Sequence, residues 1–135
     1  MADGPIDITS DRLDVDEQGG SAVFTGQVIV KQRDMTVYAE KLVIYRDQTS
    51  EQIERIEASG GVRVVQQDRV GTAENATFYQ QEDKLTLTGD ARVQQGQNLI
   101  SGAEIILLLK ENKSLVKSDE DGRVRAVFFP EQEQK

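Results

Sequence analysis

The sequence predicts an all-β fold, and three observations support this prediction. Apolar residues recur at every second position in many short runs, which is the period of a half-buried β-strand. Between these runs lie polar segments such as "DEQGG", "QQEDK" and "QQGQN", whose Gly, Asp and Asn content is typical of turns. One hairpin pattern is also repeated in tandem along the chain. Many short strands at fairly even spacing indicate an all-β fold of antiparallel hairpins.

Sets of alternating apolar residues predict the individual strands in chain order. These sets are Ile6/Ile8, Leu13/Val15, Phe24/Val28/Val30, Val62/Val64, Leu85/Leu87, Ala91/Val93 and Val124/Ala126/Phe128. The two prolines, Pro5 and Pro130, lie near the ends of the chain, where a missing N–H group interrupts no central ladder. We therefore expect the terminal strands at the edges of the sheet.

One segment near the middle of the chain has two interpretations. Thr49 and Gln52 resemble a capping box, and Ile53 and Ile56 are three residues apart, as in a single helical turn. The favoured alternative is a polar hairpin loop that feeds a strand running through Ile56 and Val62.

The tandem repeat has three copies, at Thr25–Tyr45, Ser59–Tyr79 and Thr88–Leu109. The second copy aligns with the first at an offset of 34 residues without a gap, so that Gly60 matches Gly26. The third copy needs one inserted residue. Each copy begins as (S/T)-G-x-(V/A)-x-V-x-Q, passes through a turn, and continues with a small residue, an acid and an alternating apolar strand. A partial copy opens the chain, in which Ser10, Asp11, Leu13 and Val15 match Ala39, Glu40, Leu42 and Ile44. The recurring acids are Asp11, Glu40, Glu74 and Glu104, and the recurring glutamines are Gln32, Gln66 and Gln95.

The alternation changes phase inside each copy. In the first copy Val28 and Val30 are even-numbered, Val37 is odd-numbered and Ile44 is even-numbered again. A single inward face therefore requires a bulge or corner near Glu40–Lys41. Repeated corners would bend the hairpins into two facing layers around an aliphatic interior. Because each hairpin buries its apolar face mainly on its neighbours, the stack would leave an unpaired strand at each end.

The composition excludes several classes of function. The 135 residues suit a single domain, and the net charge of −8 argues against binding to a nucleic-acid backbone. The absence of Cys and His removes thiolate chemistry, zinc–thiolate sites and the usual proton carrier near neutral pH. The longest apolar run, Ile105–Leu109, is far shorter than the roughly 20 residues that a membrane-spanning helix needs.

Two acidic segments have features of calcium or other divalent metal sites. Asp14–Gly19 begins like a calcium loop, but the twelfth position is Thr25 rather than the required Glu, so an EF-hand is rejected. Ser118–Gly122 is expected to form a turn, with a weak divalent site as the less favoured alternative. No metal site and no cofactor are therefore predicted.

The repeated acids could also be read as the carboxylate pair of a glycosidase. Catalysis needs two differently tuned carboxyl groups at one place, whereas this chain has one acid in each repeat. The acids are therefore expected to mark the corner, and the repeated glutamines to end strands and hydrogen-bond to turns.

Four segments, "PIDITSDRLDV", "FTGQVIVKQ" with "AEKLVIY", "LTGDARVQQGQNLISGAEI" and "SDEDGRVRAVFFPEQ", together resemble the OstA-like/LptA family of Gram-negative bacteria. They cover nearly the whole chain, from Pro5 to Gln132. The resemblance implies one antiparallel β-jelly-roll domain at residues 1–130, followed by a polar tail at 131–135. It also implies a periplasmic protein without enzymatic activity, whose open hydrophobic groove holds the acyl chains of lipopolysaccharide. No charged-apolar-small pattern opens the chain, so a secretory signal is either absent or removed before this sequence.

The resemblance also implies partners and site residues. Domains of this kind are expected to dock head to tail with one another and with the same fold in LptC and LptD, carrying lipopolysaccharide from the inner to the outer membrane. The strand Arg123–Pro130 would offer its edge to the next copy. The expected groove residues are Ile6, Ile8, Val28, Val30, Val37, Ile44, Val64, Phe78, Leu87, Val93 and Leu108. The expected edge-docking residues are Ile6, Ile8, Val124, Ala126 and Phe128.

Other hypotheses remain open at this point. The alternating aliphatic residues would also suit a closed sandwich core. The chain could be a structural β-repeat module that assembles into filaments without a ligand, or the related periplasmic domain of LptC or LptD. A carbohydrate-active enzyme that uses carboxylates is a third class of function.

Overall fold

The structure, a computed structural model, describes residues 4–118 and 122–130. These residues form ten β-strands and no α-helix. The strands are β1 (Asp7–Thr9), β2 (Arg12–Asp16), β3 (Ser21–Gln32), β4 (Met35–Arg46), β5 (Ile53–Gln66), β6 (Arg69–Tyr79), β7 (Lys84–Gln95), β8 (Asn98–Leu108), β9 (Lys113–Lys117) and β10 (Arg125–Val127). The prediction of an all-β fold is confirmed.

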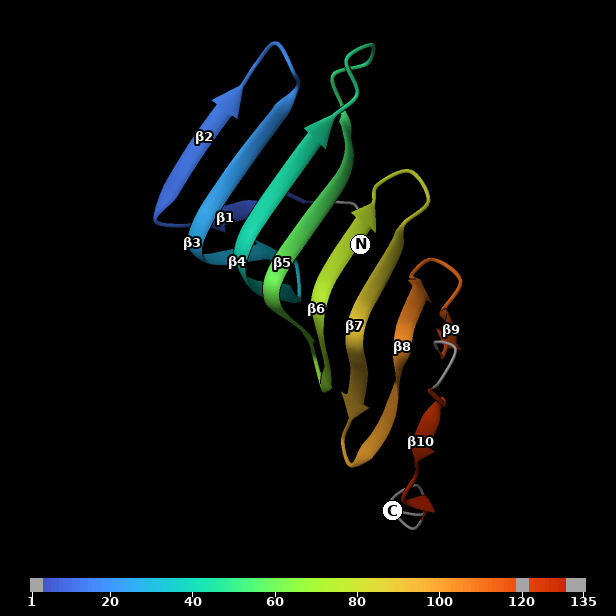
Figure 1. Cartoon of the computed structure of the whole chain (residues 1–135). Helices are drawn as coiled ribbons and strands as arrows, with labels where there is room; N and C mark the ends of the chain where they lie inside the picture. The colour runs from blue at the N-terminus through green and yellow to red at the C-terminus, as the bar shows by residue number, and fades with distance from the viewer. Residues whose placement is uncertain (1–3, 119–121, 131–135) are drawn as a thin grey trace.

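All ten strands belong to one antiparallel sheet in the order β1-β3-β4-β5-β6-β7-β8-β10 (Figure 1). β2 also pairs with β3, and β9 also pairs with β8, so each outer long strand is flanked by two short strands. The sheet does not close on itself, since β1 and β10 lie at opposite ends of its strand order. The terminal strands thus lie at the edges, as the positions of the two prolines predicted.

A line of β-bulges crosses the long strands and divides the sheet into two halves. The pairing registers of β3, β5 and β7 shift around Gly26, Gly60 and Gly89, whose φ angles are 89°, 84° and 83°. Positive φ angles of this size are open to glycine at little cost. The β4–β5 register shifts between Tyr38 and Lys41, so the corner predicted near Glu40–Lys41 is confirmed. We call this line the crease.

The crease folds the sheet so that its two halves face each other. We call the half that contains β2 and β9 the β2 half, and the half that contains β1 and β10 the β1 half. Figure 1 shows β3 and β4 turning back at the crease, so that β1 lies behind the β2 half. Buried apolar residues from both halves form one core cluster, which includes Val28 and Val64 from the β1 half and Leu42 and Leu87 from the β2 half.

The repeated glutamines end strands, as predicted, and two of the three hydrogen-bond to a hairpin turn. Gln66 is the last residue of β5, and its Nε2 donates to Asp34 Oδ1 in the preceding hairpin turn at 3.2 Å. Gln95 ends β7 and donates in the same way to Asp68 Oδ1 at 3.3 Å. Gln32 ends β3, and its Nε2 donates to the backbone oxygen of Gly4 at 3.1 Å.

The segment with two interpretations, at residues 47–52, and the segment compared with a calcium loop, at residues 14–19, both contain turns between strands. Residues 47–52 form no helix, and β5 begins directly afterwards at Ile53, so the hairpin-loop interpretation is confirmed. Asp16 Oδ1 accepts a hydrogen bond from Gly19 N at 3.0 Å in the β2–β3 turn. The turn predicted at Ser118–Gly122 includes residues 119–121, which lie outside the described residues, as does the predicted tail at 131–135.

Candidate functional site

The inner face of the folded sheet consists of rows of apolar side chains that run across the strands. In the β2 half one row joins Leu42, Ala58, Ala76, Leu87 and Ile105, which pair in sequence from β4 to β8. None of these five side chains is more than 5% exposed. Side chains of directly paired residues lie on the same face of the sheet, so these five form one continuous apolar row on the inner face.

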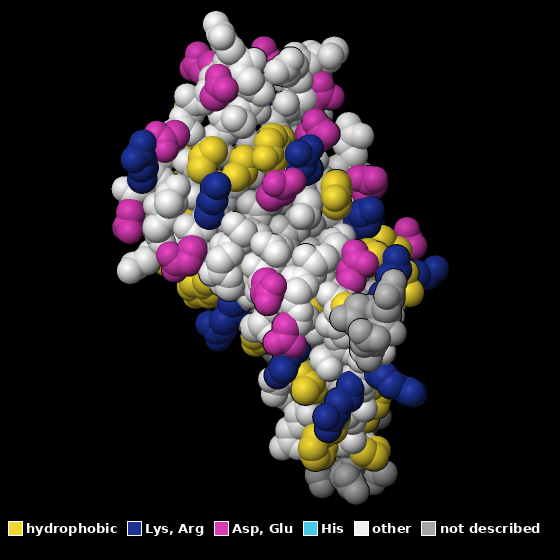
Figure 2. Space-filling view, in the orientation of Figure 1, with side chains coloured by type: hydrophobic (Ala, Val, Ile, Leu, Met, Phe, Trp, Pro, Cys, Tyr) yellow, Lys and Arg dark blue, Asp and Glu magenta, His cyan; other side chains and the backbone are white. Residues whose placement is uncertain are grey.

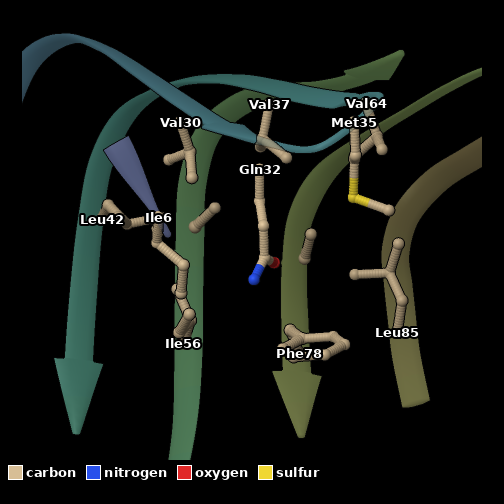
Figure 3. Close-up of a pocket in the computed structure, with 12 residues that line it drawn as sticks. Ile6, Val30, Gln32, Met35, Val37, Leu42, Ile56, Val64, Phe78 and Leu85 are labelled. Carbon is tan, nitrogen blue, oxygen red and sulfur yellow. The ribbon is translucent and has the colours of Figure 1, made fainter. Parts of the chain in front are cut away.

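An apolar groove lies between the two halves (Figure 3). It contains roughly 600 Å³ of space, including the part that opens to solvent. Its lining comes from both halves: Ile6, Val30, Gln32, Met35, Val37, Leu42, Ile56, Ala58, Val64, Ala76, Phe78 and Leu85. Eleven of these twelve side chains are apolar, so the groove suits a hydrocarbon.

The groove continues toward the C-terminal end of the sheet. A second space of about 380 Å³ shares Met35, Val64 and Leu85 with the first. It extends along Leu107 and Leu109. The apolar path therefore crosses the strands from the N-terminal segment at Ile6 to the end of β8.

Gln32 is the one polar side chain among the twelve that line the first space. It is 9% exposed, and Figure 3 shows its amide pointing into the groove, on the side of Phe78 and Ile56. The hydrogen bond from Nε2 to Gly4 O fastens the N-terminal segment beside Ile6, which also lines the groove. Because a buried amide is costly without a partner, this bond favours the position of the segment across the groove.

Most residues predicted for the groove lie on its inner face. Val30, Val37, Phe78 and Ile6 line the first space, Leu87 and Val93 line the second, and Val64 lines both. Val28 belongs to the buried core, and Ile8 and Ile44 pack against it. The structure therefore places ten of the eleven predicted groove residues on one surface.

The prediction for Leu108 is wrong, because the structure places this side chain on the outer face. Leu108 pairs with Lys84, whereas Leu107 pairs with the buried Leu85 and lines the groove. The sequence pattern predicts Glu104 of the third repeat as the equivalent of Glu40. In the structure Glu104 pairs with Thr88 as Lys41 pairs with Thr25, so Ala103 takes the place of the acid. A one-residue slip of this kind moves every side chain to the other face.

Sequence reasoning missed several groove residues. They include Met35, Leu42, Ile56, Leu85, Leu107 and Leu109. Leu42 and Leu85 could have been found, since they share the phase of Ile44 and Leu87 within their strands. Met35 follows directly after a turn, where the alternating pattern has not begun, and carries no such signal.

Three of the four recurring acids, Asp11, Glu40 and Glu74, lie at the crease, each against a glycine of a neighbouring strand. A Cβ atom built on Gly26 would come within 2.5 Å of Asp11 Oδ2, and one built on Gly60 would come within 2.7 Å of Glu40 Cβ. Glu74 has the same relation to Gly89. The acids are thus spread along the crease, which supports their role as corner markers and not as a catalytic pair.

Comparison with known proteins agrees with this geometry. Residues 7–113 match the family model described as "LptA/(LptD N-terminal domain) LPS transport protein". The chain belongs to this family of lipopolysaccharide transport proteins. It is 35% identical over 136 residues to the lipopolysaccharide export system protein LptA of Escherichia coli K12, covering 96% of this chain and 74% of that protein. LptA of Haemophilus influenzae is 28% identical, with 95% and 78% covered.

A solved structure has the same fold. LptH of Pseudomonas aeruginosa, described as the LptA-homologous periplasmic component of the lipopolysaccharide transport device, superimposes with a TM-score of 0.84. The match covers 94% of this chain and 96% of LptH, at 18% sequence identity. The LptA-like jelly-roll architecture expected from the sequence is therefore present.

In this LptA-family fold, two of the predicted docking residues, Ile8 and Ala126, lie on the edge strands, and Ile6, Val124 and Phe128 lie directly beside them in the sequence. Ile8 pairs with Val30 at the β1 edge, and Ala126 pairs with Ile100 at the β10 edge. Both pairs belong to one row of paired residues across the inner face, which also contains Val37. Val124 and Phe128 are 45% and 59% exposed. At the β2 edge, Leu13 and Val15 are 51% and 60% exposed on the inner face. The apolar surface of the groove therefore reaches both ends of the sheet.

The outer face has a different chemistry. Figure 2 shows basic and acidic side chains interspersed over the face that Figure 1 presents. Arg55 lies 4.0 Å from the ring centroid of Tyr45, and Lys84 lies 4.7 Å from that of Tyr79. The hydrogen bond from Arg55 Nε to Glu57 Oε2 at 2.9 Å raises the pKa of Arg55 above its ordinary value. Within residues 4–118 and 122–130, no helix is long and apolar enough to cross a membrane.

Proposed function

We propose that this chain binds lipopolysaccharide in the periplasm and forms part of a bridge that carries it from the inner to the outer membrane. The acyl chains lie in the apolar groove, and the sugar and phosphate groups remain in solvent. The single observation that carries this proposal is the groove between the two halves, in which eleven of twelve lining side chains are apolar.

Burial of hydrocarbon supplies the affinity. Each CH₂ group that leaves water contributes about 0.8 kcal/mol, so a few acyl carbons offset any repulsion between the lipid phosphates and a chain of net charge −8. Because the groove runs across the strands from Ile6 to Leu109, an acyl chain lies perpendicular to the strands.

The open ends support a role as one unit of a longer conduit. The free edges of β1 and β10 are suited to antiparallel strand addition by another domain of the same fold. Other copies of this chain, docked head to tail, and LptC-like and LptD-like domains are the partners of this kind. Exposed Leu13, Val15, Val124 and Phe128 at the two ends favour such docking.

The role is passive binding and not catalysis. The relatives with curated names are export system proteins. The acids of the crease lie against glycines at separate places along the sheet, which supports a structural role for them. The force that moves lipid along the groove comes from a partner.

A photo-crosslinking experiment tests the groove. A benzophenone side chain is placed at Val37, which lines the groove, or at its neighbour Tyr38, which is 38% exposed on the outer face. Leu107 and Leu108 form a second matched pair. We expect crosslinks to lipopolysaccharide at Val37 and Leu107 and none at Tyr38 and Leu108. Crosslinks confined to Tyr38 and Leu108 would refute the groove as the binding site.

A further inference from the structure

One basic side chain lies at the inner rim of the groove. Arg69 begins β6 directly after the turn at residues 67–68, so it lies near the rim of the β1 half. It pairs with Gln66, which is two residues beyond the buried Val64 and shares its inner face. Arg69 lines the second space and is the one charged residue among those that line the two spaces.

The surroundings of Arg69 in this space are apolar apart from Gln66. The other lining residues are Met35, Val64, Gly71, Leu85, Leu87, Val93, Leu107 and Leu109. An arginine packs its carbon stem against such a wall and keeps its charged end toward water. A cation at the border of a hydrocarbon groove matches an amphiphile, because the charged head and the apolar chain of an amphiphile meet at the same kind of border.

The guanidinium of Arg69 has donors to spare. Its Nη2 donates to Gln66 Oε1 at 2.9 Å in a part-buried position. Within residues 4–118 and 122–130, Arg69 makes no ion pair. A guanidinium carries five N–H donors, so the bond to a neutral amide leaves its charge and most of its donors to a ligand. Charge-assisted hydrogen bonds from arginine to phosphate are strong and often bidentate.

Gln66 holds the guanidinium in place. Its own Nε2 donates to Asp34 Oδ1 at 3.2 Å in the preceding hairpin turn. The amide is therefore bound at both ends, with its oxygen turned to Arg69. A donor that is oriented before the ligand arrives loses less conformational entropy on binding. Asp34 and Gln66 are thus positioning residues for Arg69.

The cation occurs once along a groove whose other features repeat. The residue that pairs with the repeated glutamine across the hairpin turn is Arg69 in the second repeat, but Met35 in the first and Asn98 in the third. A uniform apolar wall would let an acyl chain lie at any point along it, whereas one cation fixes the position of a charged head. The second space joins the first at Met35, Val64 and Leu85, so chains that leave Arg69 can enter the first space.

We propose that Arg69 binds a phosphate group of the lipid at the rim of the groove, while acyl chains of the same molecule extend into the apolar first space toward Ile6. This inference rests on the proposed function and adds to it the residue that contacts the head group and the direction in which the lipid lies. The phosphate stays at the border with solvent, and the first space, which no charged residue lines, receives only the hydrocarbon.

The test compares two lipids on the full chain. The probes are lipid A with its phosphate groups and the same lipid A after their removal, and displacement of an apolar fluorescent dye measures the affinity for each. Arg69→Met keeps the apolar stem and removes the charge. We expect it to lower the affinity ratio of phosphorylated to dephosphorylated lipid about 10-fold, since hydrogen bonds to charged groups are the stronger ones. Its affinity for dephosphorylated lipid should stay within about 2-fold of the wild-type value.

Arg63→Met is the matched control. It removes the same charge, but Arg63 pairs with Tyr38 on the outer face, and its guanidinium carbon lies 5.6 Å from the centroid of that ring. We expect this variant to keep the wild-type affinity ratio. Arg69→Lys retains the charge without the planar fork and should recover part of the ratio. Circular dichroism checks that each variant is folded, and Arg69→Gln repeats the test should Arg69→Met not fold.

The outcomes separate this inference from the proposed function. An unchanged ratio in Arg69→Met, or an equal change in Arg63→Met, overturns the phosphate contact and leaves the groove in place. An equal loss of affinity for both lipids in Arg69→Met also overturns it, because the side chain would then only form part of the apolar wall. Inorganic phosphate should weaken binding of the phosphorylated lipid no more than chloride does at equal ionic strength, and a specific effect would assign the site to the free anion instead. A wild-type chain that binds neither lipid overturns both the inference and the proposed function.

Discussion

The side chain of Glu40 lies against Gly60 at the crease, so closely that a Cβ atom on the glycine would come within 2.7 Å of Glu40 Cβ. Gly60 has a φ angle of 84°, and the next residue, Gly61, has a φ angle of 76°. A Cβ atom on Gly61 would meet nothing within 4 Å. These two glycines therefore separate the cost of backbone strain from the cost of a steric clash.

The first prediction concerns this pair. Gly61→Ala is expected to lower the free energy of unfolding by about 1–2 kcal/mol, because alanine at a positive φ is strained. Gly60→Ala adds the clash with Glu40 and is expected to cost about 3 kcal/mol or more. Urea denaturation of both variants measures the difference. Equal losses at the two positions would mean that the contact with Glu40 contributes nothing to the requirement for glycine.

The second prediction compares two adjacent leucines. Leu107→Gln places an amide in the groove, where an unpaired polar group costs about 1–3 kcal/mol, so we expect lipopolysaccharide affinity to fall about 10-fold. Leu108→Gln changes the outer face beside Lys84 and is expected to leave affinity within about 2-fold, because a surface substitution changes little. Titration of lipopolysaccharide against each folded variant provides the measurement. A larger loss for Leu108→Gln would place the lipid on the outer face.

The third prediction concerns the links between hairpin turns. Asp34 accepts hydrogen bonds from Gln66 Nε2 at 3.2 Å and from Gln67 Nε2 at 3.1 Å, whereas Asp68 accepts one from Gln95 Nε2 at 3.3 Å. These groups are exposed, so each bond is expected to contribute about 0.5 kcal/mol. Asp34→Ala should therefore destabilise the fold about twice as much as Asp68→Ala. The midpoints of chemical unfolding of the two variants test this order, and the reverse order would contradict it.

The fourth prediction concerns two opposite charges at the two ends of the sheet, Asp16 on β2 and Lys113 on β9, which the proposed head-to-tail docking brings near each other. Asp16→Asn keeps an oxygen acceptor for Gly19 N but removes the charge, and Lys113→Met removes the opposite charge. Each is expected to weaken self-association about 2-fold to 5-fold, since exposed ion pairs contribute about 0.2–1 kcal/mol. The double variant should lose little more than either single variant.

Sedimentation velocity at low and high salt completes this test. The wild-type chain should associate less strongly as salt rises, and the double variant should show a smaller change. Fully additive losses in the double variant would mean that Lys113 and Asp16 do not meet. Lys113 also lies 3.8 Å from Glu111 Oε1 within its own chain, so Glu111→Gln serves as the control for that contact.

Much of this fold could be predicted from local patterns. Alternating apolar residues predicted the strands, Gly and Asp predicted the turns, and Gln66 and Gln95 correctly marked strand ends. The phase change in the first repeat located the corner near Lys41, because a strand cannot keep one inward face through a change of phase without a bulge. Each of these features depends on neighbours within one hairpin, so the residue order carries the information.

By itself, the sequence determined that this chain is a tandem series of bent hairpins with an aliphatic inner face. Only the tertiary structure decided which residues of β8 face the groove beyond the crease. An error of one residue in the alignment of the third repeat exchanges Leu107 for Leu108. It also decided that Gln32 and Met35 join the groove, since their places depend on the N-terminal segment and on the opposite half of the sheet. Pattern within a strand is local, whereas the facing of two halves is set by the fold of the whole sheet.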